Sequence, residues 1–202
     1  MVRSGTELKL IFFPGAKATA TAMALLETLE LVQRADFTAV LPRMEDIKPI
    51  GEIREITVHH TGFPEAWLAD DLAATANHLA EIQTLHSDPA GRNWADIGYH
   101  YAVDRMGRIW QLRDLRFQGA HVKNHNRQNV GIVVLGNFDI QQPPGAQVTA
   151  LAALLNFMLI AYDNLKVHTH QQLADGPISC PGTHLQTWMD MTFGGSARKR
   201  FS

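Results

Sequence analysis

The sequence predicts an α/β fold in which a mixed central β-sheet is flanked by helices on both faces, with an N-terminal helical extension. Runs of β-branched residues at 55–60 and 129–135 have the composition of buried strands. Residues 68–86 and 149–162 repeat apolar side chains at helical spacing. Strands that alternate with such helices are typical of α/β domains, and 202 residues suffice for one domain with a modest extension.

Residues 1–50 differ from the remainder and are expected to form an extension to a main domain at 51–202. The alanine- and leucine-rich stretch at 16–33 predicts an amphipathic helix. The apolar face of this helix consists of Leu25, Leu26, Leu29 and Val32. Residues 36–50 contain two prolines and are expected to form a connector. We expect this extension to pack against the main domain or to bind a protein partner.

The main domain is expected to begin with the strand at 55–60 and the helix at 68–86. The apolar repeat of that helix is Leu68, Leu72, Leu79, Ile82 and Leu85. Strands at 98–104 and 108–113 are expected to form a hairpin. Thr149 is the expected N-cap of the next helix, which ends at Tyr162. Its inward residues are Leu151, Leu154, Leu155, Met158 and Tyr162. A strand at 165–168 and a helix at 184–191 are expected to follow.

Composition excludes several classes of function. Eighteen basic and twenty acidic residues give a formal net charge of −2, so no basic face for nucleic acid is expected. A single cysteine excludes an intramolecular disulfide. No apolar run approaches the ~20 residues needed to cross a bilayer. Lys9 and Pro14 interrupt the apolar N-terminal run, so we expect no secretory signal and synthesis in the cytoplasm.

Three residues that are far apart in the sequence are candidates for a metal site. His59 ends the first strand of the main domain, where α/β proteins gather ligands, and His170 and Cys180 flank one loop. Two imidazoles and a thiolate suit a tetrahedral zinc ion with the fourth position open for water. The alternative is a satisfied polar His59 and a surface His170. The pattern also leaves His60 open in place of His59, because adjacent strand residues point to opposite faces.

Five sequence blocks give this chain a resemblance to a known family. In order they are Val58–Thr61, Trp94–His100, Gly119–His121, Asn129–Ile132, and His170 with Cys180–Gly182. Together, over residues 53–190, they resemble the N-acetylmuramoyl-L-alanine amidases of the phage-lysozyme and peptidoglycan-recognition-protein type. The resemblance implies a zinc-dependent enzyme that hydrolyses the bond between N-acetylmuramic acid and L-alanine in bacterial peptidoglycan.

The resemblance also assigns roles to individual residues. His59, His170 and Cys180 match the family's zinc ligands, and Tyr99 matches a tyrosine that assists catalysis near the metal. His121 matches a histidine that lines the groove for the peptide stem, and Asn126 lies where the family often has a groove asparagine. Zinc would lower the pKa of a water molecule from ~15.7 toward ~7 and polarise the lactyl carbonyl, while Tyr99 stabilises the oxyanion or orients the water.

The chain departs from the family pattern near its cysteine. Ile178 stands where many active relatives have Lys or Thr, and Gln171–Gln172 replace the usual Arg–Asp. Ser179 or His168 is a candidate substitute. A peptidoglycan-binding module without activity is therefore the alternative function, although such modules usually lack the cysteine ligand. Paired carboxylates of a glycosidase are not indicated. We expect action on the cell wall after phage-type release or as a virion component, with recycling of wall fragments as another possibility.

Overall fold

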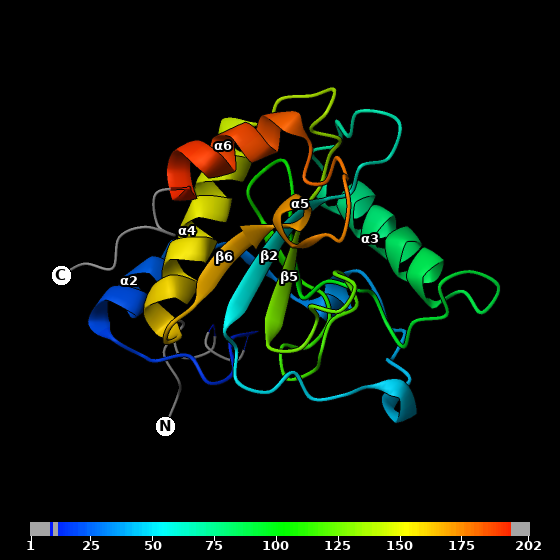
Figure 1. The fold of residues 1–202 in the computed structure, drawn as a ribbon, viewed down its shortest axis with the longest axis horizontal. Coiled ribbons are helices and arrows are strands. Elements are labelled where there is room, and N and C mark those ends of the chain that lie inside the picture. The colour runs from blue at the N-terminus through cyan, green and yellow to red at the C-terminus, as the bar shows by residue number, and fades with distance from the viewer. Residues whose placement is uncertain (1–8, 10–11, 195–202) are drawn as a thin grey trace.

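The structure, a computed structural model of the 202-residue chain, describes residue 9 and residues 12–194. Its six described strands form one sheet in the order β1-β4-β3-β5-β2-β6, of which β5, β2 and β6 are seen side by side in Figure 1. They are β1 Leu31–Val32, β2 Glu55–His60, β3 Tyr101–Val103, β4 Ile109–Gln111, β5 Asn129–Val134 and β6 Lys166–Thr169. Only β3 and β4 pair antiparallel among them, which confirms the predicted hairpin and the mixed sheet.

Helices cover both faces of this sheet, as the sequence predicts (Figure 1). Helices α2, α4 and α6 lie on one face, and α3 lies on the other. The helices are α2 Ala20–Glu27, α3 Leu72–Ser87, α4 Gly145–Ala161, α5 His170–Leu173 and α6 Thr183–Phe193. Two 3-10 turns, η2 Arg34–Asp36 and η3 Met44–Asp46, join α2 to the main sheet. Within the described residues, every helix is too short or too polar to cross a membrane.

The alternation of side chains along the strands creates two apolar cores. In β3, Tyr101 and Val103 join the larger core under α2, α4 and α6. Ala102, between them, joins the smaller core under α3. Successive strand residues point to opposite faces, so this division continues across the sheet. At the end of β2, His59 pairs with Val133, which belongs to this smaller core.

The N-terminal segment adds to both the sheet and the larger core. Helix α2 is shorter than predicted: the Thr19 side chain caps its first turn, and the helix ends before Thr28. The chain then turns so that Leu31 and Val32 pair with β4 in parallel, because an edge of the main sheet is available to them. Binding of a partner by residues 1–50 stays a prediction. Within this segment, Leu41 is 83% exposed and is one side chain available for such contact.

Two helices of the main domain differ from their predicted form. Helix α3 begins at Leu72, because the Asp71 side chain caps it. Its buried side includes His78 and His86, whereas Leu68, Leu72 and Leu85 are exposed. Helix α4 begins four residues earlier than predicted, after Pro144, and contains Thr149 within its first turns. The predicted inward side chains of α4 are buried.

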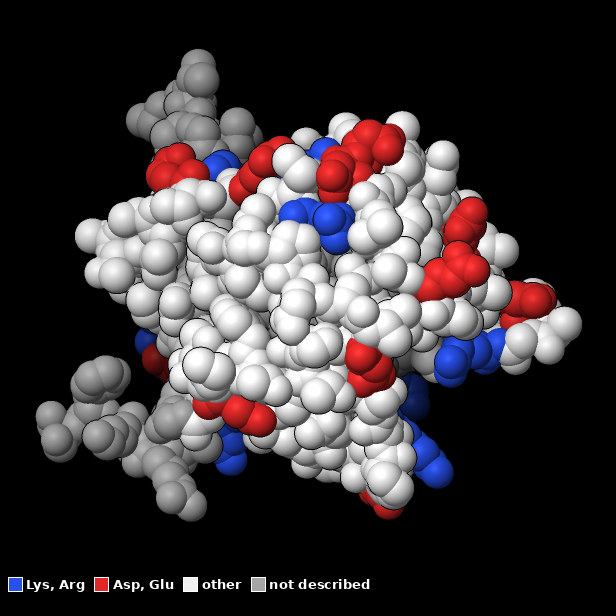
Figure 2. Space-filling view, turned by 90° about the horizontal axis from the view of Figure 1, so that it is seen from above, with Lys and Arg blue, Asp and Glu red and all other residues white. Residues whose placement is uncertain are grey.

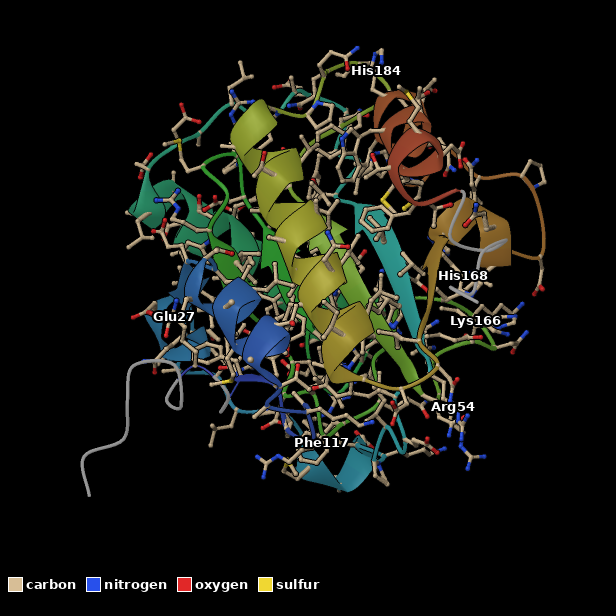
Figure 3. All side chains as sticks on the ribbon, turned by 90° about the vertical axis from the view of Figure 1, so that its left-hand side faces the viewer. Glu27, Arg54, Phe117, Lys166, His168 and His184 are labelled. Atoms are coloured by element: carbon tan, nitrogen blue, oxygen red, sulfur yellow. The ribbon has the colours of Figure 1, made fainter. Side chains whose placement is uncertain are left out.

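Charge and cavity size by themselves do not locate a site. Acidic and basic side chains are interspersed around a broad uncharged area on the face shown in Figure 2. A cavity of about 1170 Å³ lies beside β6 and α6, next to Lys166 and His168 (Figure 3). Its lining includes none of the three predicted metal ligands. The candidate site is therefore defined by side chains that could bind a metal.

Candidate metal centre

The last two residues of β2 point to opposite faces of the sheet. His59 pairs with Val133 of β5, which belongs to the core under α3. The next residue, His60, lies on the other face, where its Nδ1 accepts a hydrogen bond from the backbone N–H of Phe138 at 3.3 Å. Only His59 therefore faces the side of the sheet where the other candidate ligands lie. The structure therefore places His59, and not His60, with the other two candidate ligands.

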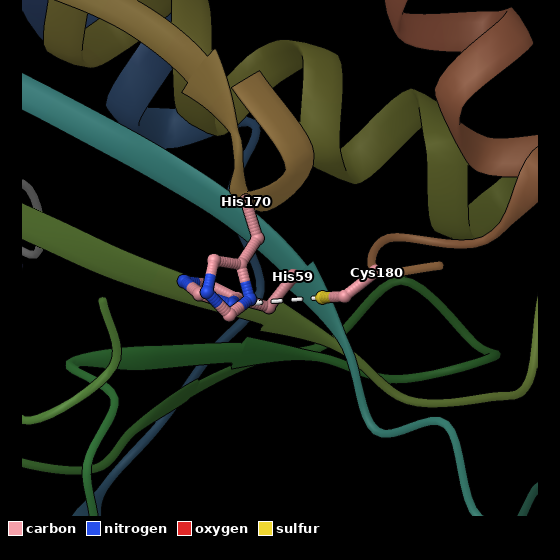
Figure 4. A group of neighbouring side chains, drawn as sticks. All are labelled: His59, His170 and Cys180. Atoms are coloured by element: carbon pink, nitrogen blue, oxygen red, sulfur yellow. Dashed lines mark hydrogen bonds between the residues drawn. The ribbon is translucent and has the colours of Figure 1, made fainter. Parts of the chain in front are cut away.

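His59, His170 and Cys180 come together at the end of β2 (Figure 4). Strand β6 runs parallel to β2 and ends at Thr169, so His170 at the start of α5 lies beside His59. One potential ligand atom from each of the three residues lies within 4.8 Å of the other two. The Sγ of Cys180 is 3.7 Å from Nδ1 of His59. The topology thus gathers side chains that are 121 positions apart in the sequence.

Local packing fixes the loop that carries Cys180. The backbone carbonyl of Cys180 accepts a hydrogen bond from the N–H of Gln171 at 3.0 Å. Gly182 has a φ of +88°, and a Cβ there would lie 2.6 Å from the carbonyl carbon of Phe138. Only glycine fits this conformation and this close approach. The Cys–Pro–Gly sequence therefore seats the thiol next to the histidines.

The electrostatics of the three side chains suit a cation. Burial lowers the pKa of His59 well below its usual value, and neighbouring His121 and His170 lower it further. Burial also lowers the pKa of His170, so both imidazoles are neutral at neutral pH. Burial raises the pKa of the Cys180 thiol to about 12, so a nearby cation is required to hold it as a thiolate. Two neutral imidazoles and one thiol fit zinc with an open fourth position.

Tyr99 lies beside this cluster and lines a groove. Its ring centroid is 5.1 Å from that of His59. Burial, and then the charge of Cys180, raise the pKa of Tyr99, so its hydroxyl remains a hydrogen-bond donor at neutral pH. The groove has a volume of about 630 Å³ and is also lined by residues 61–64, by His86 and by Arg92. This volume is in the range of ligand sites.

His121 and Asn126, predicted to bind substrate, use their polar atoms within the protein. His121 is 8% exposed, and its Nδ1 lies 3.1 Å from Nε2 of His59. The Oδ1 of Asn126 accepts hydrogen bonds from the backbone N–H groups of His121 and Val122, at 2.8 and 2.9 Å. Asn126 thereby shapes the loop that holds His121. Contact of either side chain with substrate stays a prediction.

Ser179 and His168, the two residues that the sequence suggests as substitutes for Ile178, both have partners within the protein. Ser179 is hydrogen bonded to Asp139. His168 lies at the β6 edge, where its Nε2 is 4.0 Å from Glu55. The groove instead contains His86, which the helix pattern does not mark as functional. Its Nδ1 accepts a hydrogen bond from the N–H of Gly98 at 3.1 Å, next to Tyr99, and only the tertiary structure reveals this.

Comparisons with known proteins relate this chain to amidases and to peptidoglycan-recognition proteins. A sequence profile described as N-acetylmuramoyl-L-alanine amidase matches residues 49–183. Peptidoglycan-recognition protein SC2 of Drosophila melanogaster is 32% identical over 138 residues, which are 65% of this chain and 71% of that protein. The endolysin of Klebsiella phage KP32 is 31% identical over 117 residues, which are 55% of this chain and 74% of that protein.

Solved structures share the fold. A variant of Drosophila PGRP-LB in complex with tracheal cytotoxin superposes with a TM-score of 0.69 and 26% identity. The alignment covers 80% of this chain and 93% of that chain. This similarity confirms the predicted fold class, and the family profile spans more than half of the sequence. The chain belongs to the N-acetylmuramoyl-L-alanine amidase family.

Proposed function

We propose that this protein is a zinc-dependent amidase that hydrolyses the amide bond between the lactyl group of N-acetylmuramic acid and L-alanine in bacterial peptidoglycan. The observation that carries the proposal is the cluster of His59, His170 and Cys180 beside Tyr99, which lines the groove. Membership of the amidase family supports the reaction. The donor set, two imidazoles and a thiol, supports the metal.

The side chains of this centre have complementary tasks. His59 and His170, both neutral, and Cys180 as a thiolate would hold the zinc ion. Bound zinc supplies a Lewis acid and promotes ionisation of water near neutral pH. Tyr99 keeps its proton and donates a hydrogen bond to the carbonyl oxygen of the scissile amide as negative charge develops there. The half-buried positions of His170 and Cys180 leave one side of the cluster open to substrate.

The groove supports a muropeptide as substrate. The structure of the PGRP-LB variant contains tracheal cytotoxin, and that protein shares this fold. In this chain Tyr99 and Arg92 both line the groove, and the guanidinium of Arg92 lies 4.8 Å above the ring of Trp94. Arg92 therefore places a positive charge at the wall of the groove. Asp88 lines the same groove, so its wall presents charges of both signs to a stem peptide.

Binding of peptidoglycan without hydrolysis is the second candidate function. Ile178, which is 38% exposed, favours it, because this side chain cannot donate a hydrogen bond to developing charge. Cys180 favours the enzyme, because a binding module has no need of a third metal ligand. The two functions differ in whether new amino termini appear.

Digestion of purified peptidoglycan by the full chain tests the proposal. We expect mass spectrometry to detect new L-alanine amino termini, which disappear with a chelator and return when zinc is added. Binding to the wall without new termini would identify a binding module. Termini that persist after complete removal of metal would contradict zinc dependence and leave the family assignment intact.

We also propose that the protein reaches the cell wall by phage-type release or as a virion component. Its similarity to a phage endolysin supports this route. Immunodetection in purified virions and in lysates, before and after membrane permeabilisation, tests it. Detection only in the cytoplasm, with activity on soluble wall fragments alone, would favour recycling instead.

A further inference from the structure

The ring of His121 lies between His59 and strand β5. Its Nδ1 is 3.1 Å from Nε2 of His59, and its Nε2 is 3.2 Å from the backbone oxygen of Asn129. The rings of His59 and His121 are almost perpendicular, with centroids 5.1 Å apart. Both side chains are buried. A continuous path of hydrogen bonds therefore leads from a strand carbonyl to a candidate metal ligand.

The acceptor at the end of this path fixes the direction of each hydrogen bond. A backbone carbonyl can only accept, so Nε2 of His121 carries a proton and donates to Asn129. The ring is buried, and its two hydrogen-bond partners are His59 and the carbonyl of Asn129, so no carboxylate stabilises a second proton; the ring is neutral and its Nδ1 is a bare acceptor. His59 must then donate from its own Nε2. Its Nδ1 is left unprotonated and faces Cys180 Sγ at 3.7 Å.

The surroundings of His121 hold its ring in this position. A Cβ at residue 131 would lie 2.6 Å from Cδ2 of His121, so the glycine in β5 leaves the space that the ring occupies. On the other side, Asn126 fixes the backbone N–H of His121. The ring is thus held by the strand below it and by its own loop.

We propose that His121 is a positioning residue that selects the tautomer of His59 and presents the lone pair of His59 Nδ1 to the metal. This inference rests on the proposed zinc site, and it gives His121 a task different from contact with the peptide stem. Partners that orient a metal-bound histidine typically change metal affinity by about 10- to 100-fold. The same hydrogen bonds exist in the metal-free protein, so the proposal can be examined without activity.

Two substitutions of His121 separate the hydrogen bonds from the volume of the side chain. The amide of His121→Gln can accept from His59 and donate to Asn129, whereas His121→Leu can do neither. We expect His121→Leu to weaken zinc binding about 10- to 100-fold, measured by competition with a chromophoric chelator. We expect His121→Gln to restore most of the affinity. His125→Leu, at an exposed histidine of the same loop, is the control and should match the wild type.

Nitrogen-15 NMR of histidine in the metal-free full chain reads the tautomer directly. We expect His59 to be protonated at Nε2 in the wild type and in His121→Gln, and to show mixed tautomers in His121→Leu. Protonation of wild-type His59 at Nδ1 would overturn the proposal, whether or not His121→Leu folds. So would zinc affinity of a folded His121→Leu variant within twofold of the wild type. If the wild type binds no zinc, the proposed function fails, and the tautomer still decides this inference.

Discussion

Residues 12–48 and residues 49–183 contribute to this protein in different ways. All ten histidines and the cysteine lie between positions 59 and 184, and the family profile matches only the second region. The first region supplies structure: α2 packs on α4, and Phe13 stacks on Tyr101 at a centroid distance of 5.2 Å. One of its arginines, Arg34, forms a salt bridge at 2.8 Å with Asp96, whose side chain is fully buried.

The Arg34–Asp96 pair shows that the two regions are not independent. Asp96 lies three residues before Tyr99 and also accepts a hydrogen bond from Gln83 of α3. Arg34 donates in addition to the backbone oxygen of Leu112, next to β4. A residue outside the family match therefore compensates the buried charge of the segment that carries Tyr99. A segment that lacks chemistry of its own can still determine the geometry of a site.

The largest expected effect belongs to the second region alone. Replacing Cys180 with serine removes the thiolate ligand, so we expect zinc binding to collapse and hydrolysis to fall by roughly 10³-fold or more. The unfolding of the metal-free protein should stay close to that of the wild type. Metal content, peptidoglycan digestion and urea denaturation measure the three quantities. Full activity of Cys180→Ser would place the chemistry elsewhere.

The next effect tests the contribution of the first region. Arg34→Met leaves Asp96 buried without its partner, so we expect the free energy of unfolding to fall by about 3–5 kcal/mol. Arg54→Met is the matched control: its salt bridge to Glu52 is exposed, and the loss should be below about 1 kcal/mol. Urea denaturation of both variants gives the comparison. Equal losses would show that Arg34 is no more important than a surface arginine.

Acid sensitivity is expected to arise from the histidine-containing region. Burial lowers the pKa of His100 from 6.5 to about 4, and its ring accepts from Gly131 and donates to Phe117. Between these two pH values the unfolded chain binds a proton here that the folded chain does not. Stability should therefore fall as the pH decreases from 6.5 to 4, by roughly 1.4 kcal/mol per pH unit for this residue.

The variant His100→Gln isolates this contribution. Its amide can make the same two hydrogen bonds but binds no proton. Urea denaturation of the metal-free protein between pH 7 and 4.5 should show a smaller slope than in the wild type, by up to one proton. An unchanged slope would assign the acid sensitivity to other buried groups, such as His86, whose pKa burial also lowers to about 4.

Two tyrosines give the smallest of the expected effects and the closest comparison. Tyr99 faces His59, whereas the hydroxyl of Tyr101 donates to the backbone oxygen of Phe12 in the first region. We expect Tyr99→Phe to slow hydrolysis by roughly 10²-fold without changing zinc affinity. Tyr101→Phe should lose about 1 kcal/mol of stability and keep its rate. A loss of rate in Tyr101→Phe, with an unchanged rate in Tyr99→Phe, would contradict the role proposed for Tyr99.

Local sequence predicts the strands of the main domain well and the exposed faces of its helices less well. Strand β2 has the predicted bounds, because three of its consecutive residues, Ile56, Thr57 and Val58, are β-branched and no Gly or Pro interrupts it. The helix at 149–162 starts earlier, at Gly145, because Pro144 has no N–H to leave unpaired and its φ of −60° is compatible with the start of a helix. In α3, His86 is buried instead of Leu85, because it accepts a hydrogen bond from a loop that the local pattern does not contain.

The candidate ligands illustrate the same limit within the site. The residue types His59, His170 and Cys180 suggest zinc, but their proximity depends on β6 lying beside β2. The contact of His59 with His121 depends on Gly131 of β5, where the absence of a side chain leaves space for the ring of His121. The spacing of residues in the sequence does not reveal this. The sequence does not predict strand β1 for a related reason: its two residues are extended only because they pair with β4 at the edge of the main sheet.

The contact between α2 and α4 has a consequence for synthesis on the ribosome. The N–H of Lys17 donates to the carbonyl of Ala161 at 2.8 Å, and Phe13 packs edge-on against Phe157. The partners of this early segment are thus translated some 140 residues later. At a rate of about 5–20 residues per second, the delay is on the order of ten seconds. During that interval the apolar side of α2 has no native surface to cover it, so this nascent segment is where we expect chaperones to bind.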